Sequence, residues 1–113
     1  MTLTVHRLTD DVAVAGQLEP AAMAEAAAAG FRSVVNNRPD FEGGPTQPTS
    51  ASIEAAARAA GLAYEWQPVS PSVQTPEDIA RFAALLESLP KPILAFCRTG
   101  TRSGKLVRAA SAR

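Results

Sequence analysis

Short apolar runs alternate with helix-forming segments along most of this sequence, and this alternation constrains the fold more than any other feature. Gly30 and Gly61 are placed to end two alanine-rich helices. Thr75-Pro76-Glu77-Asp78 supplies the N-cap, the early proline and the acidic third position that begin another. Strands that alternate with helices form a mainly parallel sheet covered on both faces. We therefore expect a three-layer α/β fold, in which helices flank a mainly parallel sheet of four to five strands.

The expected elements follow from apolar periodicity and from the Gly and Pro residues that separate them. Strands are expected at residues 3–8, 12–15, 31–35, 62–69 and 93–96, the first two forming a hairpin. Helices are expected at residues 21–29, from a cap at Thr49 or Ser50 to Gly61, from Pro76 to about Leu89, and at 104–112. The connection over residues 36–48 is long and rich in Gly and Pro, which indicates a functional loop.

Length and charge limit the function classes open to the chain. Its 113 residues suit a single domain, which we expect to span residues 1–113. Eleven basic residues balance eleven acidic ones, so we expect neither nucleic acid nor a membrane as a partner. The apolar runs are too short to span a bilayer and the N-terminus lacks a signal-peptide pattern, so a cytoplasmic location is expected. One cysteine and one histidine cannot assemble a thiolate-rich zinc site, and we expect no metal or cofactor.

The segment Cys97-Arg98-Thr99-Gly100-Thr101-Arg102-Ser103 lies between the last expected strand and the last expected helix. Backbone N–H groups in such a turn can surround an anion, and Gly100 can adopt the tight backbone angles that this requires. A lone cysteine is often only a small buried hydrophobic residue, but the N–H groups and neighbouring arginines favour a reactive thiolate here. We predict that Cys97 and Arg102 are catalytic. The predicted anion-binding loop comprises Arg98, Thr99, Gly100, Thr101 and Ser103.

Two residues of the long loop are further candidates. Asp40 could act as a general acid if the loop folds over the pocket, and Arg38 could add a positive charge at its rim. Asp40 also precedes a turn, where such residues commonly bond their own backbone. His6 is expected at the surface, and Asp78 is explained by helix capping.

The segment Phe96 to Ser103 resembles the persulfide-carrying loop of rhodanese-type sulfurtransferases, in which Cys is followed after four residues by Arg and then Ser. Elsewhere the chain resembles the phosphatase-like domain of beta-lactamase hydrolase-like proteins, through residues 34–40, 64–69 and 75–78. This resemblance implies a small cysteine-phosphatase-like α/β fold, which occurs alone or fused to a persulfide-oxidising metallo-beta-lactamase-type domain. It also implies an enzyme that acts on a small anionic or sulfane-sulfur substrate, with a persulfide-oxidising enzyme as a partner.

Two departures from the cysteine-phosphatase pattern bear on the reaction. Those enzymes carry His before the cysteine and Arg after five intervening residues, whereas Phe96 and Ser103 stand at these positions. The loop at residues 70–74 also lacks the Asp that commonly protonates the leaving group. Our leading hypothesis is therefore a cysteine-dependent sulfurtransferase that carries sulfane sulfur as a Cys97 persulfide. The alternatives are a cysteine-dependent phosphatase that forms phosphocysteine, and a non-catalytic anion-binding or redox-sensing module.

Overall fold

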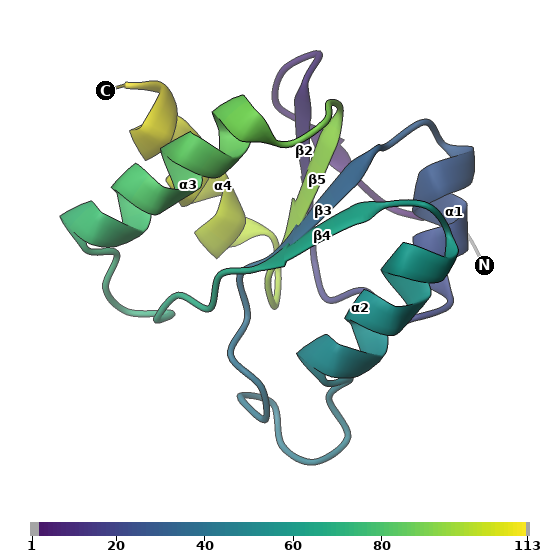
Figure 1. The fold of residues 1–113 in the computed structure, drawn as a ribbon. Helices are drawn as coiled ribbons and strands as arrows, with labels where there is room; N and C mark the ends of the chain where they lie inside the picture. The colour runs from purple at the N-terminus through teal and green to yellow at the C-terminus, as the bar shows by residue number, and fades with distance from the viewer. Residues whose placement is uncertain (1–2, 113) are drawn as a thin grey trace.

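The computed structural model describes residues 3–112. Met1 and Thr2, which begin the segment without a signal-peptide pattern, and Arg113 lie outside this range. The chain forms five strands and four helices within the described residues, in an α/β arrangement (Figure 1). In chain order these elements are β1 (His6–Arg7), β2 (Val12–Ala15), α1 (Ala22–Ala28), β3 (Ser33–Asn36), α2 (Ser50–Ala59), β4 (Ala63–Trp66), α3 (Pro76–Ser88), β5 (Ile93–Phe96) and α4 (Thr101–Ser111).

The sheet has the strand order β1-β2-β5-β3-β4. Strands β2, β5, β3 and β4 are parallel, and β1 pairs antiparallel with β2. The expected α/β class, the mainly parallel sheet and the N-terminal hairpin are therefore confirmed. In Figure 1, α1 and α2 cover one face of the sheet, and α3 and α4 cover the other.

The two faces of the sheet carry separate apolar clusters, because successive strand residues point to opposite sides. In β5, Leu94 and Phe96 pack toward α1 and α2, whereas Ile93 and Ala95 pack toward α3 and α4. All four of these residues are fully buried. Burial on both faces explains why the sequence of β5 is continuously apolar rather than alternating.

Helix starts follow the predicted caps. The hydroxyl of Thr49 accepts a hydrogen bond from Ser52 N, and Thr75 forms a capping box with Asp78 at the start of α3. Gly30 and Gly61 have φ values of 100° and 82°, which confirms their left-handed positions after α1 and α2.

Several expected boundaries were wrong. The first strand is shorter than residues 3–8, because only His6 and Arg7 pair with β2. Strand β4 ends at Trp66 rather than at residue 69, just before Pro68, which lacks an N–H donor. Helix α4 begins at Thr101 rather than at Gly104, because the left-handed turn at Gly100 returns the chain directly to helical geometry.

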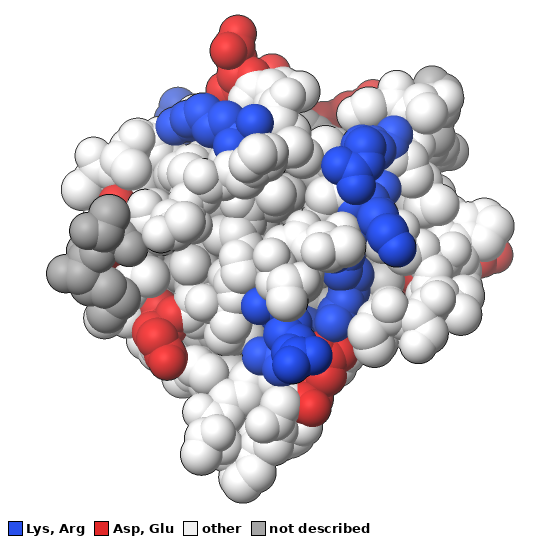
Figure 2. All heavy atoms as spheres, turned by 180° about the vertical axis from the view of Figure 1, so that it is seen from behind, with Lys and Arg blue, Asp and Glu red and all other residues white. Residues whose placement is uncertain are grey.

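Charge is mixed over the surface seen in Figure 2, where basic side chains form separate groups and acidic side chains lie beside the upper and the lower of them. This matches the balanced totals of basic and acidic residues. Within residues 3–112, no helix is long and apolar enough to cross a membrane.

Candidate active site

The turn between β5 and α4 lies at the carboxyl edge of the central strand of the sheet (Figure 1). The end of the adjacent strand β2 holds the turn in place. Cys97 N donates to Ala15 O at 3.3 Å, and Gln17 N donates to Arg98 O at 3.1 Å. A Cβ atom on Gly16 would lie 3.2 Å from Arg98 O, so Gly16 allows the two segments to approach closely. The backbone at the end of β2 thus fixes Cys97 and Arg98.

Gly100 shapes the turn around the sulfur. Its φ of 93° lies in the left-handed region that other residues rarely adopt. In this conformation its N–H points inward and donates to Cys97 Sγ at 3.1 Å. Its carbonyl accepts the hydrogen bond from Gly104 N at 2.9 Å, which begins the α4 ladder.

The pKa of the Cys97 thiol lies below its ordinary value. Burial raises this pKa, because the side chain is only 1% exposed. Hydrogen bonds from the backbone and hydroxyl of Ser103, and from the backbones of Thr99 and Gly100, outweigh burial and lower it. The turn therefore favours a thiolate, the form of cysteine that acts as a nucleophile.

Ser103 and Asn37 connect the turn to the neighbouring strand β3. Both side chains are fully buried, and Ser103 Oγ donates to Asn37 Oδ1 at 2.8 Å. A hydroxyl has a single proton, so Ser103 must turn this proton away from Asn37 to donate it to the sulfur. The amide of Asn37 is itself fixed, because its Nδ2 donates to Gln67 O at 3.1 Å.

Arg102 lies in the first turn of α4 with its guanidinium group buried. Nη1 donates to the carbonyls of Asn37 and Val69 at 3.3 and 3.1 Å, and Nη2 donates to Glu42 Oε1 at 2.9 Å. Nε is buried and has no partner among the described residues. Because an unpaired buried donor costs about 1–3 kcal/mol, Nε is a donor that an anion in the site can satisfy.

Glu42 occupies the space between two arginines. Its Oε1 accepts hydrogen bonds from Arg102 Nη2 and from Arg38 Nε, both at 2.9 Å. Burial raises the pKa of Glu42, but the hydrogen bonds and charges of Arg102 and Arg38 outweigh it and hold the pKa below its ordinary value. The carboxylate is therefore ionised at neutral pH.

A cavity of about 330 Å³ opens at Cys97. Its walls come from the turn, the start of α4 and the loop that follows β4. The lining residues are Pro71, Ser72, Val73, Gln74, Cys97, Arg98, Thr99, Thr101, Arg102 and Lys105. Three of these side chains are basic and none is a carboxylate or a histidine. The cavity suits an anion or a thiolate, and its lining contains no carboxyl group or imidazole to protonate a leaving group.

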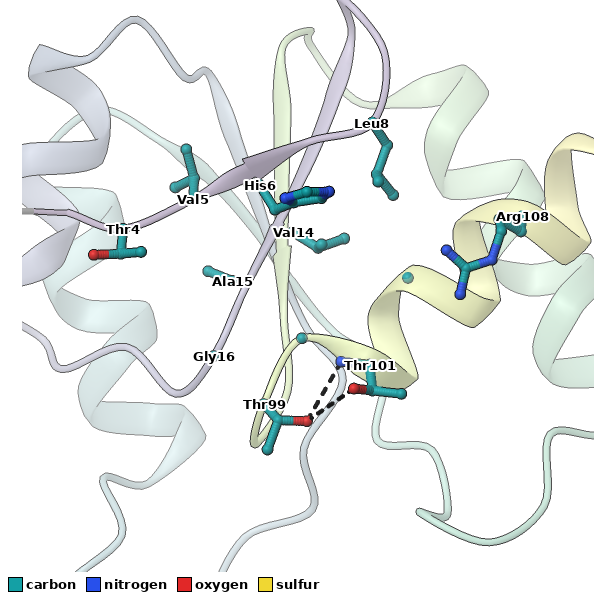
Figure 3. A pocket seen from close by; sticks show the side chains of 12 residues that line it. Thr4, Val5, His6, Leu8, Val14, Ala15, Gly16, Thr99, Thr101 and Arg108 are labelled. Atoms are coloured by element: carbon teal, nitrogen blue, oxygen red, sulfur yellow. Dashed lines mark hydrogen bonds between the residues drawn. The ribbon is translucent and has the colours of Figure 1, made fainter.

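A second cavity, of about 490 Å³, lies on the other side of the same turn. Figure 3 shows Thr99 and Thr101 at its base, with His6 and Arg108 on facing walls. Thr99 and Thr101 line both cavities, whereas Cys97 lines only the first. His6 is exposed, as expected.

The two long-loop candidates have different positions. Arg38 is buried, and it lines a third cavity of about 530 Å³ together with Arg98, Arg102 and Glu42. Asp40 lines none of the cavities beside the turn. Its Oδ1 accepts a hydrogen bond from Ser50 N at 2.7 Å, so its carboxylate caps the first turn of α2. The structure therefore brings Arg38 to the rim of the site and leaves Asp40 at the start of a helix.

Residues that the sequence reasoning missed complete the site. Asn37 accepts hydrogen bonds from Ser103 in the turn and from Arg102, and Glu42 accepts one from Arg102. Gln74 Nε2 donates to Arg102 O at 3.0 Å, and Lys105 lines the Cys97 cavity. One signal was available for Asn37, because it directly follows a buried strand at the carboxyl edge of the sheet. Glu42 had no comparable signal, since it lies inside a long loop.

The fold and the site define a class of protein. A cysteine at the carboxyl end of a central parallel strand, N–H groups around its sulfur and an arginine in the next helical turn are features of a cysteine-phosphatase-like enzyme domain.

The chain belongs to the family described as "Beta-lactamase hydrolase-like protein, phosphatase-like domain", whose model matches residues 4–113. It is 37% identical over 97 residues to the beta-lactamase hydrolase-like protein of Agrobacterium fabrum, and this match covers 86% of this chain and 22% of that protein. It is 36% identical over 96 residues to the beta-lactamase hydrolase-like protein of Xylella fastidiosa, and this match covers 85% of this chain and 22% of that protein. The chain thus spans about a fifth of the length of these relatives.

A solved structure of a candidate phosphatase from Neisseria meningitidis has the same fold. The TM-score is 0.86 at 31% sequence identity, and the match covers 94% of this chain and 75% of that one. The predicted family, fold class and assignment as a cysteine-phosphatase-like enzyme are therefore confirmed.

Proposed function

We propose that this domain is a sulfurtransferase in which Cys97 carries a sulfane sulfur atom as a persulfide. The Cys97 thiolate attacks the outer sulfur of a donor R–S–SH, a new S–S bond forms, and the donor's S–S bond breaks to release the thiolate R–S⁻, while the proton stays on the outer sulfur. An acceptor thiolate or cyanide then attacks the outer sulfur of the Cys97 persulfide. This second step returns Cys97 to the thiolate form, so no net oxidation or reduction of the protein occurs.

The composition of the Cys97 cavity carries this proposal. A phosphatase needs an acid to protonate the alcohol that leaves, but no carboxylate or histidine lines this cavity. Sulfur transfer needs no such acid, because its leaving groups are thiolates. The lowered pKa of Cys97 suits this reaction, since sulfur transfer begins from the thiolate, as does attack on a phosphate ester.

The spacing of the turn supports it further. Four residues separate Cys97 from Arg102, one fewer than in the cysteine-phosphatase pattern. In addition, three N–H bonds of the Arg102 guanidinium are donated to protein acceptors. Fewer of its donors remain for the oxygens of a phosphoryl group than a free guanidinium offers.

The test compares the wild type with Cys97→Ser in two assays. The first supplies glutathione persulfide or thiosulfate with cyanide, and the second supplies p-nitrophenyl phosphate. We expect thiocyanate to form faster than without protein only in the presence of the wild type, and no phosphate release from either protein. Absence of this increase with both donors, under conditions where the wild type is folded, would contradict the proposal.

Phosphate-ester hydrolysis is the second candidate. The observation that favours it is the 31% identity to the candidate phosphatase of Neisseria meningitidis, together with the free Nε of Arg102. Release of phosphate by the wild type, lost in Cys97→Ser, would establish this reaction. Asp40→Asn then tests the acid, and the cap that Asp40 provides to α2 predicts a loss of stability rather than of a catalytic proton.

A persulfide-oxidising partner is also proposed. The relatives are about five times as long as the segment that this chain matches, so their remaining sequence can hold a further enzyme domain. An enzyme that consumes persulfides would share its substrate with the Cys97 site. Co-purification of the domain with such an enzyme, or a higher rate of persulfide consumption when both are present, tests this.

A further inference from the structure

The ionised carboxylate of Glu42 touches the arginine that serves the Cys97 site. Arg102 lines the Cys97 cavity, and it also lines the neighbouring cavity together with Glu42 and Arg98. Glu42 Oε1 bonds both Arg102 and Arg38, while Oε2 is buried and has no partner among the described residues. Only the guanidinium group of Arg102 therefore separates the negative charge of Glu42 from an anion bound at that group.

The loop between β3 and α2 holds Glu42 in this position. Gln47 Oε1 accepts a hydrogen bond from Gly43 N at 2.7 Å, and Gln47 Nε2 donates to Pro39 O at 2.9 Å. The guanidinium of Arg38 packs directly on Gly43, where a Cβ atom would lie 2.6 Å from Nη2. Asp40 is fixed at the start of α2, so hydrogen bonds hold the loop on both sides of Glu42.

This placement has a consequence for the charge of the ligand. The Glu42 carboxylate offsets much of the positive charge of Arg102, and it repels a bound anion in proportion to the charge of that anion. A dianion meets about twice the repulsion of a monoanion, whereas a neutral persulfide meets almost none. The partly buried setting of Glu42, with 19% of its side chain exposed, limits screening by salt.

We propose that Glu42 is a specificity-determining residue that makes the Cys97 site select neutral and singly charged groups over dianions. The application to sulfur donors rests on the proposed function: organic persulfides are then accepted in preference to the dianion thiosulfate. The charge selection itself holds whatever reaction Cys97 performs.

Two anions of similar shape and different charge test the selection. Sulfate is a dianion, and methanesulfonate is a tetrahedral monoanion. Both are titrated by NMR into Cys97→Ser and into the same variant with Glu42→Gln, which keeps an oxygen acceptor for the two arginines. The matched control is Glu54→Gln, which removes the same charge from an exposed pair with Arg58 on α2.

We expect Glu42→Gln to strengthen sulfate binding relative to methanesulfonate by about tenfold, the effect of removing a nearby unit charge. Glu54→Gln and the charge-conserving Glu42→Asp should leave this ratio unchanged. Equal changes for both anions would leave the ratio unchanged and mean that Glu42 only positions Arg102. No change in the affinity for either anion would mean that Glu42 has no role, and either result overturns the proposal.

Two further controls keep the test decisive. Thermal unfolding is recorded for every variant, and if Glu42→Gln does not fold, the nearly isosteric Glu42→Met takes its place. The titrations need no turnover, so they separate this inference from the proposed function. A shifted ratio in a protein without sulfur transfer would leave charge selection standing and remove only the sulfurtransferase.

Discussion

Ser103→Ala tests the link between the buried hydroxyl and the reactivity of Cys97. The hydroxyl of Ser103 donates its single proton either to Cys97 Sγ, which lowers the pKa of Cys97, or to Asn37 Oδ1, which lies 2.8 Å away. Its removal should raise the pKa of Cys97, although not to the ordinary value, because the backbone N–H groups of Ser103, Thr99 and Gly100 remain. A smaller fraction of Cys97 is then thiolate at neutral pH.

The same substitution has a cost in stability that can be worked from the structure. Asn37 and Ser103 are both fully buried, so the change leaves Asn37 Oδ1 without its partner. A buried acceptor without a partner costs about 1–3 kcal/mol. In a domain of 113 residues each kcal/mol lowers the melting temperature by about 4 °C.

Alkylation by iodoacetamide measures the first effect, and urea unfolding measures the second. We expect the pH profile of alkylation to move to higher pH in Ser103→Ala, with a loss of about 1–3 kcal/mol in the free energy of unfolding. Ser111→Ala is the matched control, since Ser111 is exposed at the end of the same helix. An unchanged alkylation profile would refute a role of the hydroxyl in lowering the pKa, even if stability fell.

Three more predictions follow from particular contacts. Gly100→Ala should lose about 1–2 kcal/mol of stability from backbone strain at φ 93°, and it should slow the alkylation of Cys97. The control Gly30→Ala has a similar φ of 100° and open space within 4 Å of the added Cβ, so it should lose stability without slowing alkylation. Thr75→Ala should lose about 1 kcal/mol in urea unfolding, because it removes the α3 capping box, while Thr46→Ala at an exposed loop position should not. Because folding lowers the pKa of Cys97, its thiolate stabilises the folded state; this stability is fully present above the ordinary thiol pKa and is lost as pH falls through the folded pKa. The unfolding free energy of the wild type relative to Cys97→Ser should therefore rise with pH between these two values, and a flat difference would contradict the lowered pKa.

Most of the fold could be predicted because local signals agreed with the tertiary structure. The helix around Phe82 had a capping box, an early proline and apolar residues at helical spacing. Strand β5 had a continuously apolar sequence that fits a strand buried on both faces. The start of α4 could not be predicted in the same way, since Thr101 and Ser103 are as common in turns as in first helical turns.

The candidate site was only partly predictable, because the sequence shows neighbours along the chain and not across it. Cys97, Gly100 and Arg102 lie within one turn, so their spacing was visible. The contacts of Arg102 with Asn37 and Glu42 join residues that are 65 and 60 positions apart. Nothing in the local sequence distinguishes Glu42, which bonds Arg102, from Asp40, which caps a helix.

The central claim is that Cys97 accepts and passes on a sulfur atom, and intact mass spectrometry tests it most directly. The wild type and Cys97→Ser are exposed to glutathione persulfide and separated from excess donor. Their intact masses are then measured before and after addition of cyanide. We predict that the wild type alone gains the mass of one sulfur atom and that cyanide removes it with release of thiocyanate. A wild type that gains no mass, or that keeps the added sulfur in the presence of cyanide, would contradict the account.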